Sequence, residues 1–228
     1  VVENVLSDLE GVDILVYEPT LRYQNVAKKT GVEDLTIARA LILELIRRYS
    51  VLGIECSLLE VHKLAWFVGR AIHLHGLADP LKLRFEAKNY GPYAPNLSHL
   101  LQALDGSYLH ADKRIPDSGP QDIIWFNDAR KEELAGYLSH EGASYAPALS
   151  LATEMIQGFE SPYGLELLST VDWLVQREGV VPNAQAIRQG LEQWPAGEGW
   201  AQRKTRLFSE RVIELALIHL NEVGAAQY

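Results

Sequence analysis

The sequence contains a single cysteine, Cys56, and this scarcity excludes several classes of protein. One cysteine cannot form an intramolecular disulfide, and it cannot supply a zinc site built from several cysteines. This usage is typical of a reducing cytoplasm, so we predict a cytoplasmic location. Cys56 lies near Ile54 and Leu58, which favours a small buried residue over a reactive thiol.

Long hydrophobic runs are missing as well. No segment approaches the roughly 20 apolar residues that a membrane helix requires, so no membrane association is predicted. The chain also lacks an initiator methionine and a basic region followed by an apolar stretch, as in a secretory signal. It opens abruptly with VVENVLSDLEGVDILVYEP, and we therefore expect a fragment of a longer protein.

Basic residues are absent from one long stretch, between Lys131 and Arg177, and the net charge of the chain is −9. The acidic residues in this stretch are Glu132, Glu133, Glu141, Glu154, Glu160, Glu166 and Asp172. Such an excess disfavours contacts with phosphate groups and favours a basic partner. A solvated acidic surface that aids solubility is an equally good interpretation.

The common catalytic motifs are absent too: there is no Walker A loop, G-x-G-x-x-G, G-x-S-x-G or H-E-x-x-H. His73 and His75 are two residues apart, so on a helix they point away from each other and do not share a metal. Burial could raise the pKa of Glu166 and make it a general acid, but no second carboxylate or nucleophile stands at a fixed spacing. We therefore predict a binding module with no catalytic residue, metal or cofactor.

The residues that are present divide the chain into two parts. Residues 12–17 (VDILVY) form a short predicted strand, which we interpret as the last piece of a preceding α/β domain over residues 1–19. Residues 20–228 are expected to form one domain. The predicted fold class is mainly α: a single compact multi-helix domain with a small β-hairpin or wing, preceded by a remnant strand.

The prediction of a mainly α fold rests on the helical spacing of apolar residues and on residues typical of helix caps. The predicted helices cover residues 34–49, 57–74, 97–104, 129–138, 146–157, 162–177, 183–193 and 209–224. Two short β-like runs between residues 108 and 126 flank a turn at 113–119, where we expect the hairpin.

The segment GFESPYGLELLSTVDWLV (158–175) combines several specific choices. Ser161 and Pro162 are strong helix-start residues, and leucines and valines fall on one side of the predicted helix. Trp173 falls on the other side, with Glu166. Another element of this chain or a partner must cover the indole, and an internal helix is the favoured cover.

Two further groups have alternative interpretations. Tyr90 and Tyr93 lie on a turn set by Gly91-Pro92, where they either anchor an interface or pack the loop onto the body. The basic residues 203, 204 and 206 follow a tryptophan and could contact nucleic acid. Pairing with acidic helices of the same chain is favoured for them, because the chain as a whole is acidic.

Four stretches carry a resemblance to a known family: SLLEVHKLAWFVGRA (57–71), LKLRFEAKNYGPYAPNLSHLLQALDGSYL (81–109), GFESPYGLELLSTVDWLV (158–175) and WAQRKTRLFSERVIELALIHL (200–220). In this order they resemble the C-terminal domain of DarG-type antitoxins, across most of residues 36–223. The opening VDILVYEP resembles the closing strand of the macrodomain in that family. The helix followed by YGP more distantly resembles the Panacea group of antitoxin domains.

The resemblance implies an antitoxin domain that binds and silences DarT, a toxin that ADP-ribosylates thymine in single-stranded DNA. Hydrolysis of ADP-ribose would belong to the missing macrodomain, so the resemblance implies no enzyme here and contact with ADP-ribose only through that domain. The toxin's DNA channel should be basic, so we predict that the acidic stretch mimics DNA and blocks it. The predicted contacts are Glu154, Glu160, Tyr163, Glu166 and Trp173, with Tyr90 and Tyr93 from the loop.

Two alternatives to the inhibitor stay open. A DNA-binding, winged-helix-like regulator of a toxin–antitoxin operon would use the 108–126 hairpin as its wing, although the acidic charge speaks against direct nucleic-acid binding. A hydrolytic enzyme would need a pair of carboxylates that only a structure can reveal.

Overall fold

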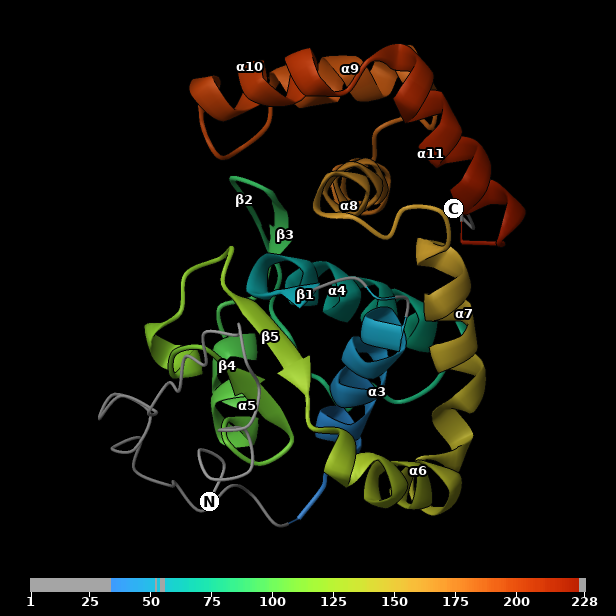
Figure 1. The fold of residues 1–228 in the computed structure, drawn as a ribbon. Coiled ribbons are helices and arrows are strands. Elements are labelled where there is room, and N and C mark those ends of the chain that lie inside the picture. Colours follow the sequence, from blue (N-terminus) through green and yellow to red (C-terminus); the bar gives the residue numbers. More distant parts are fainter. Residues whose placement is uncertain (1–33, 52, 54–55, 226–228) are drawn as a thin grey trace, which may run out of the picture.

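Helices form most of the part of the chain that the computed structural model describes, which is residues 34–51, 53 and 56–225 (Figure 1). The helices are α3 (Ile37–Val51), α4 (Leu58–Leu74), α5 (Leu97–Leu104), α6 (Lys131–His140), α7 (Ala146–Ile156), α8 (Pro162–Gln176), α9 (Ala184–Glu192), α10 (Glu198–Leu207) and α11 (Glu210–Glu222). The strands are β1 (Cys56–Ser57), β2 (Glu86–Lys88), β3 (Gly91–Tyr93), β4 (Leu109–Ala111) and β5 (Ile123–Phe126). The prediction of a single, mainly α domain with a small hairpin is confirmed.

The helix α8 lies between two groups of elements (Figure 1). On one side it packs against α9 and α11, and α10, which packs against α9, bonds to it through Arg203 and Lys204; on the other side it packs against α4 and β3. The helix α4 in turn packs against α3 and α7. The predicted strand at residues 12–17, and the domain end that it would represent, lie outside the described residues.

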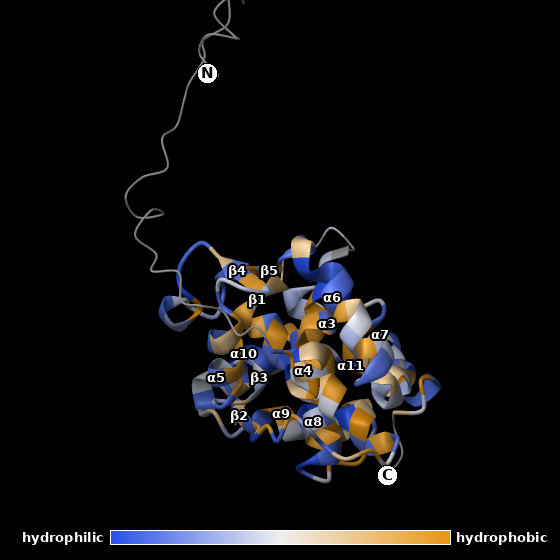
Figure 2. Cartoon of the chain, turned by 90° about the horizontal axis from the view of Figure 1, so that it is seen from below, coloured by the Kyte–Doolittle hydropathy of each residue, from blue (hydrophilic) through white to orange (hydrophobic). Residues whose placement is uncertain are grey.

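The helix α4 begins where the sequence predicts, at a capping box. Ser57 Oγ accepts a hydrogen bond from the Glu60 N–H at 3.3 Å, and Glu60 Oε2 accepts one from the Ser57 N–H at 2.8 Å. These two bonds satisfy orphan amides of the first turn. Most of the following helix is buried, and Figure 2 shows α3 and α4 rich in apolar residues where they meet.

The helix α8 also begins as predicted, because Ser161 Oγ accepts a hydrogen bond from the Gly164 N–H at 3.0 Å. Every residue from 164 to 174 is buried, polar residues included. The side of α8 that carries Glu166 and Trp173 is therefore covered within the chain, as is the apolar side. The favoured prediction that an internal element covers Trp173 is confirmed.

The predicted hairpin between residues 108 and 126 is present as β4 and β5, which pair antiparallel with Leu109 opposite Phe126. The strand β1 adds a third, unpredicted strand on the other edge of β5, with Cys56 opposite Ile124. Cys56 is a buried free cysteine, and burial raises the pKa of its thiol, as expected of a packing residue.

A second hairpin, β2 and β3, occupies the Tyr90-Gly91-Pro92 segment, which the sequence indicates only as a turn. Gly91 lies at φ = 103° with Thr170 and Ser169 of α8 directly beside it, so a side chain has no room there. The helix α10 is likewise unpredicted. Among the described residues, no helix is long and apolar enough to cross a membrane.

Candidate functional site

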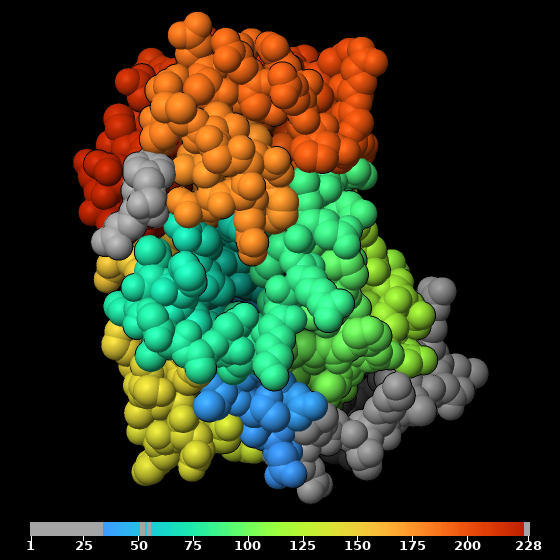
Figure 3. Space-filling view, turned by 180° about the vertical axis from the view of Figure 1, so that it is seen from behind, coloured from blue at the N-terminus to red at the C-terminus, as the bar shows by residue number. Residues whose placement is uncertain are grey.

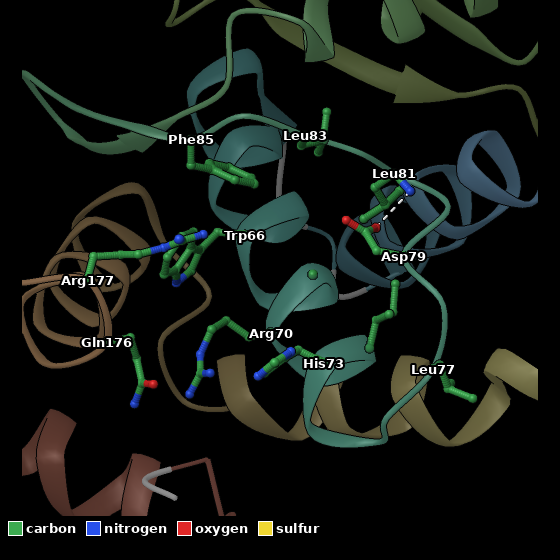
Figure 4. Close-up of a pocket in the computed structure, with 12 residues that line it drawn as sticks. Trp66, Arg70, His73, Leu77, Asp79, Leu81, Leu83, Phe85, Gln176 and Arg177 are labelled. Carbon is green, nitrogen blue, oxygen red and sulfur yellow. Dashed lines mark hydrogen bonds between the residues drawn. The ribbon is translucent and has the colours of Figure 1, made fainter. Parts of the chain in front are cut away.

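A cavity of about 370 Å³ opens where α4, the segment after it and the end of α8 meet. Figure 3 shows the hollow on the back face of the molecule, and Figure 4 shows the side chains around it. Its volume falls within the range of about 300–1,000 Å³ that small-molecule sites occupy. The polar and aromatic side chains that line it are Trp66, Arg70, His73, Asp79, Phe85, Gln176 and Arg177.

Helical geometry brings three of these residues together on α4. Trp66, Arg70 and His73 are four and three residues apart, which places them along one side of the helix (Figure 4). Trp66 is buried and Arg70 is nearly so, whereas His73 is exposed near the end of the helix. This side of α4 is therefore aromatic and buried at Trp66, and polar and exposed at His73.

The aromatic floor consists of rings from three different segments. The ring of Trp66 meets Phe85 edge-on at 5.1 Å and lies 5.2 Å from the ring of Trp173. The guanidinium of Arg177 lies over Trp66, 5.6 Å from the ring centre (Figure 4). A planar ring with a cation over it is a surface on which a flat, anionic ligand can stack.

The buried carboxylate of Asp172 holds two of the side chains at the cavity in place. Asp172 Oδ2 accepts hydrogen bonds from Trp66 Nε1 at 2.7 Å and from Arg70 Nε at 3.1 Å. Burial raises the pKa of the Asp172 carboxyl, while Arg70 and Trp66 act to lower it. Asp172 does not line the cavity, so we assign it the role of positioning the two side chains that do.

With Arg70 paired to Asp172, the exposed charged groups at the cavity are one cation, Arg177, and one carboxylate, Asp79. Arg177 is exposed and forms no ion pair within the part of the chain that the structure describes. Asp79 is the one carboxylate among the described residues that line the cavity, and its Oδ1 accepts the Leu81 N–H at 2.8 Å (Figure 4). Among these same residues, no three His, Cys, Asp or Glu side chains are placed to hold a metal ion.

The structure places Glu166, one of the predicted partner contacts, in an internal ion-pair cluster. Its carboxylate is 5% exposed and accepts bonds from Arg203 Nη1 at 2.6 Å and from Lys204 Nζ at 2.9 Å. These cations keep the pKa of Glu166 below its ordinary value although burial acts to raise it. The favoured prediction that basic residues of this segment pair with an acidic helix is confirmed for residues 203 and 204.

The three predicted tyrosine contacts differ in exposure. Tyr163 is 43% exposed. Tyr90 is half-buried under Arg203, whose guanidinium lies 5.0 Å from the ring centre. Tyr93 is half-buried and stacks on His62 at 4.0 Å. Both loop tyrosines thus pack against the body of the domain, and a contact with a partner stays a prediction for all three.

The remaining predicted contacts, Glu154, Glu160 and Trp173, also differ in exposure and in hydrogen bonding. Glu154 is exposed on α7, and Glu160 is half-buried, where its Oε2 accepts the Gly158 N–H at 2.7 Å. Trp173 is 6% exposed and donates its indole N–H to Glu178 at 2.9 Å. Of the predicted set, only Trp173 packs against the floor of the cavity, through Trp66.

The site residues of the cavity were not selected by sequence analysis. Trp66 and Arg70 stand in the quoted stretch 57–71 and show the spacing of one helix face, which is the signal that could have drawn attention to them. Arg177 follows Trp173 by four residues, on the same side of the predicted helix. Its place at the cavity depends on the packing of α8 against α4, which no local pattern predicts.

The chain is similar to proteins named DNA ADP-ribosyl glycohydrolase. One from Thermus aquaticus is 37% identical over 199 residues, which are 85% of this chain and 51% of the relative. Relatives of the same name from Mycobacterium bovis and Mycobacterium tuberculosis are each 31% identical over 234 residues, which span 94% of this chain and 60% of the relative. The chain thus spans about half the length of the curated relatives it matches. No protein-family model matches it.

This comparison corrects the functional predictions from the sequence. The relatives, which match 85–94% of this chain, are named as an enzyme. The prediction of a C-terminal antitoxin domain that only binds and inhibits a toxin is therefore wrong. The prediction that the chain is not an enzyme is contradicted by the same finding. The alternative of a transcriptional regulator does not fit that name either.

Proposed function

We propose that this chain is part of a DNA ADP-ribosyl glycohydrolase and that the cavity between α4 and α8 receives the ADP-ribosyl group of ADP-ribosylated DNA. The names of the relatives support the class of reaction. The site is supported mainly by the aromatic floor of Trp66 and Phe85, with Arg177, which forms no ion pair among the described residues, over the Trp66 ring.

The chemistry of the ligand suits these groups. ADP-ribose offers a flat adenine, two negatively charged phosphates and two sugars with hydroxyl groups. The aromatic floor can stack the base, and Arg177 can pair with a phosphate through its planar guanidinium. Gln176 and Asp79, which also line the cavity, can bond hydroxyl groups.

Hydrolysis of a glycosidic bond uses a carboxylate that activates water, commonly as one of a pair, and among the described residues that line the cavity Asp79 is the one carboxylate. Asp79 has a carboxylate oxygen left over after its bond to the Leu81 N–H, and it stands on the exposed rim where water has access. We assign it this role. Asp172 is not among the residues that line the cavity and instead holds Trp66 and Arg70 in place.

The test combines binding and hydrolysis. Binding of ADP-ribose is measured by calorimetry, and release of ADP-ribose from an ADP-ribosylated single-stranded oligonucleotide is measured by chromatography. Arg177→Ala should weaken binding about tenfold or more, because a hydrogen bond to a charged group contributes roughly 1.5–3 kcal/mol. Asp79→Asn should lower the rate of release and leave binding nearly unchanged.

Arg211→Ala is the matched control, since Arg211 is an exposed arginine of α11 away from the cavity. It should bind like the original chain. If the original chain binds no ADP-ribose, or if Arg177→Ala binds as well as Arg211→Ala, the cavity is not the site. This proposal also sets aside the expectation that the chain does not contact DNA directly.

Three further predictions remain proposals. Residues 1–19 are proposed to end a preceding macrodomain-like domain, with the helical domain beginning at residue 20. An ADP-ribosyltransferase of the DarT type is proposed as a protein partner. A cytoplasmic location is supported by the single cysteine.

A further inference from the structure

A second cavity, of about 440 Å³, lies at the start of α4, where the β2–β3 hairpin and the loop around residues 115–120 form its other walls. Its aromatic lining residues are His62, Tyr90 and Tyr93. Its aliphatic lining residues are Leu58, Leu59, Leu101, Ile115, Pro116 and Pro120. Apolar walls with few polar groups are typical of a small-molecule site, and aromatic rings in such walls favour a flat ligand.

His62 supplies a hydrogen-bond donor to this cavity. Its Nδ1 accepts the Ala94 N–H at 3.2 Å, so the ring proton is on Nε2. Nε2 has no hydrogen-bond partner among the described residues, yet no buried side-chain nitrogen of these residues lacks a partner. Nε2 therefore touches accessible space, and the second cavity provides that space, because His62 is 6% exposed and lines this cavity.

The wall that carries this donor is fixed before a ligand binds. The ring of Tyr93 stacks on His62 with 4.0 Å between the ring centres, and burial lowers the pKa of His62 to about 3, so the ring stays neutral. Lys63 Nζ donates to the Pro92 carbonyl at 2.7 Å and so ties the hairpin to α4. This amine is buried, which lowers its pKa to about 7, and its bond is to the wall.

The charge at this cavity is opposite to that of the chain. No Asp or Glu is among the described residues that line it, although the net charge of the chain is −9. Lys88 lines the cavity, and its side chain is 53% exposed. Its ion pair with the equally exposed Glu86 is of a kind that contributes little, so Lys88 can exchange Glu86 for an anionic group of a ligand.

The two cavities follow one another along the same side of α4. Leu59 and His62 line the second cavity, Trp66 and Arg70 line the first, and these residues are three or four positions apart. His62 and Trp66 are separated by about 6 Å along the helix axis. The segment 81–93 contributes to both linings. Adjacent units of one extended ligand therefore reach both cavities.

We propose that the second cavity binds a nucleotide of the DNA strand that carries the ADP-ribosyl group, with the base inside and the phosphate at Lys88. A base is flat, and its edge carries oxygen or nitrogen acceptors to which the His62 Nε2–H can donate. Its faces can pack on the aliphatic and aromatic walls. The inference rests on the proposed function, which supplies the DNA strand, whereas the match to a base and a phosphate comes from the cavity.

The experiment measures binding of a short fluorescein-labelled oligothymidylate to the full chain by fluorescence anisotropy, with no ADP-ribose present. Thymidine monophosphate and deoxyribose phosphate are the competitors. The labelled strand should bind, and thymidine monophosphate should displace it. Deoxyribose phosphate should need a concentration about tenfold higher or more, because it lacks the base.

Two variants test the interior of the cavity. Ser98→Trp, at an exposed residue of the lining, should fill the space and weaken the binding of thymidine monophosphate about tenfold or more. His62→Asn keeps an acceptor for the Ala94 N–H and removes the Nε2–H, so it should weaken this binding about fivefold. Unchanged affinity in Ser98→Trp, with unchanged thermal melting, would overturn the proposal.

A pair of lysine variants tests the phosphate contact. Lys88→Gln should weaken binding of the strand about threefold or more and lower the slope of its salt dependence by about one. Lys131→Gln is the matched control, because Lys131 is an exposed lysine of α6 that lines neither cavity. Equal affinities and equal salt slopes in the two variants would remove Lys88 from the site and contradict the proposal.

Calorimetry with ADP-ribose reads the first cavity separately. If the chain binds ADP-ribose but not the oligothymidylate, the present inference fails and the proposed function stands. If it binds the oligothymidylate with the expected response to Ser98→Trp but binds no ADP-ribose, the proposed function fails and the nucleotide site stands. Binding of thymidine monophosphate without binding of the strand would also overturn the inference, since the site would then take a free nucleotide.

Discussion

Arg203 donates two hydrogen bonds to the carboxylate of Glu166, at 2.6 Å and 3.1 Å. Lys204 adds a third at 2.9 Å, and its side chain is fully buried. The cluster joins α10 to α8, and it places the polar side of α8 inside the protein. Removal of the carboxylate would leave two cations without their partner in a poorly solvated region.

We therefore predict that Glu166→Ala lowers the free energy of unfolding by about 3 kcal/mol, as expected when one partner of a buried ion pair is removed. Urea denaturation followed by circular dichroism measures this loss. Glu154→Ala is the control, because Glu154 is exposed on α7, and its effect should stay below about 0.5 kcal/mol.

A paired replacement separates the two causes of that loss. Glu166→Leu together with Lys204→Met removes the buried charges of both partners and should recover much of the stability. If the double variant is less stable than Glu166→Ala, packing around α8 dominates and the ion pairs contribute little.

The two serines that precede α4 and α11 should respond differently to removal of the hydroxyl. Ser57 Oγ accepts a hydrogen bond from the first turn of α4, whereas Ser209 makes no such bond at the start of α11. Ser57→Ala should cost about 1 kcal/mol, and Ser209→Ala should cost less than about 0.5 kcal/mol. Thermal melting of both variants checks this, and equal shifts would contradict it.

Gly91 and Gly106 offer a matched pair of backbone sites. Both have positive φ, but an added Cβ at Gly91 would lie 3.0 Å from Thr170 Oγ1, whereas nothing lies within 4 Å at Gly106. Gly106→Ala should therefore cost about 1 kcal/mol from backbone strain alone. Gly91→Ala should cost clearly more, and chemical denaturation of the two variants under the same conditions gives the difference.

Stability should depend on pH through Lys63. Its pKa in the folded chain is about 7, below the ordinary value of 10.5, so above about pH 7 the unfolded chain binds more protons than the folded one. The free energy of unfolding from this group therefore rises with pH between about 7 and 10. Lys204, with its pKa lowered to about 8 by burial, acts in the same direction.

The contribution of Lys63 is isolated by comparison with Lys63→Met. Urea denaturation of both chains at about pH 6.5 and about pH 9 should show a smaller rise in stability with pH for the variant. An identical rise in both chains would place the titration elsewhere.

Local signals predicted most helices of the fold. Capping residues and apolar spacing placed α4, α5 and α8 within one or two residues of their bounds. The helix α10 was missed because its 10 residues are mostly polar, and its burial comes from Lys204 and Ala201 rather than from an apolar stripe. The strand β1 was missed because two residues pair only through contact with the distant β5.

The candidate site was beyond the reach of local patterns for a different reason. A helical wheel for residues 162–177 separates polar from apolar residues but does not say whether water or another helix meets the polar side. Glu166 and Asp172 look like surface carboxylates in sequence, yet each finds its cations on another helix. Whether water or another helix meets this polar side is decided by tertiary packing, which brings α4 and α10 against α8.

The enclosure of α8 on all sides has a consequence for how the molecule opens. Its amide hydrogens can meet solvent only if α9 and α11 separate from it or if α4 and β3 move away. Hydrogen exchange of the segment 164–174 should therefore report the global opening of the domain, whereas exposed turns among the described residues exchange through local fluctuations. A ligand that binds between α4 and the end of α8 would then slow exchange along the whole helix, including turns that it does not touch.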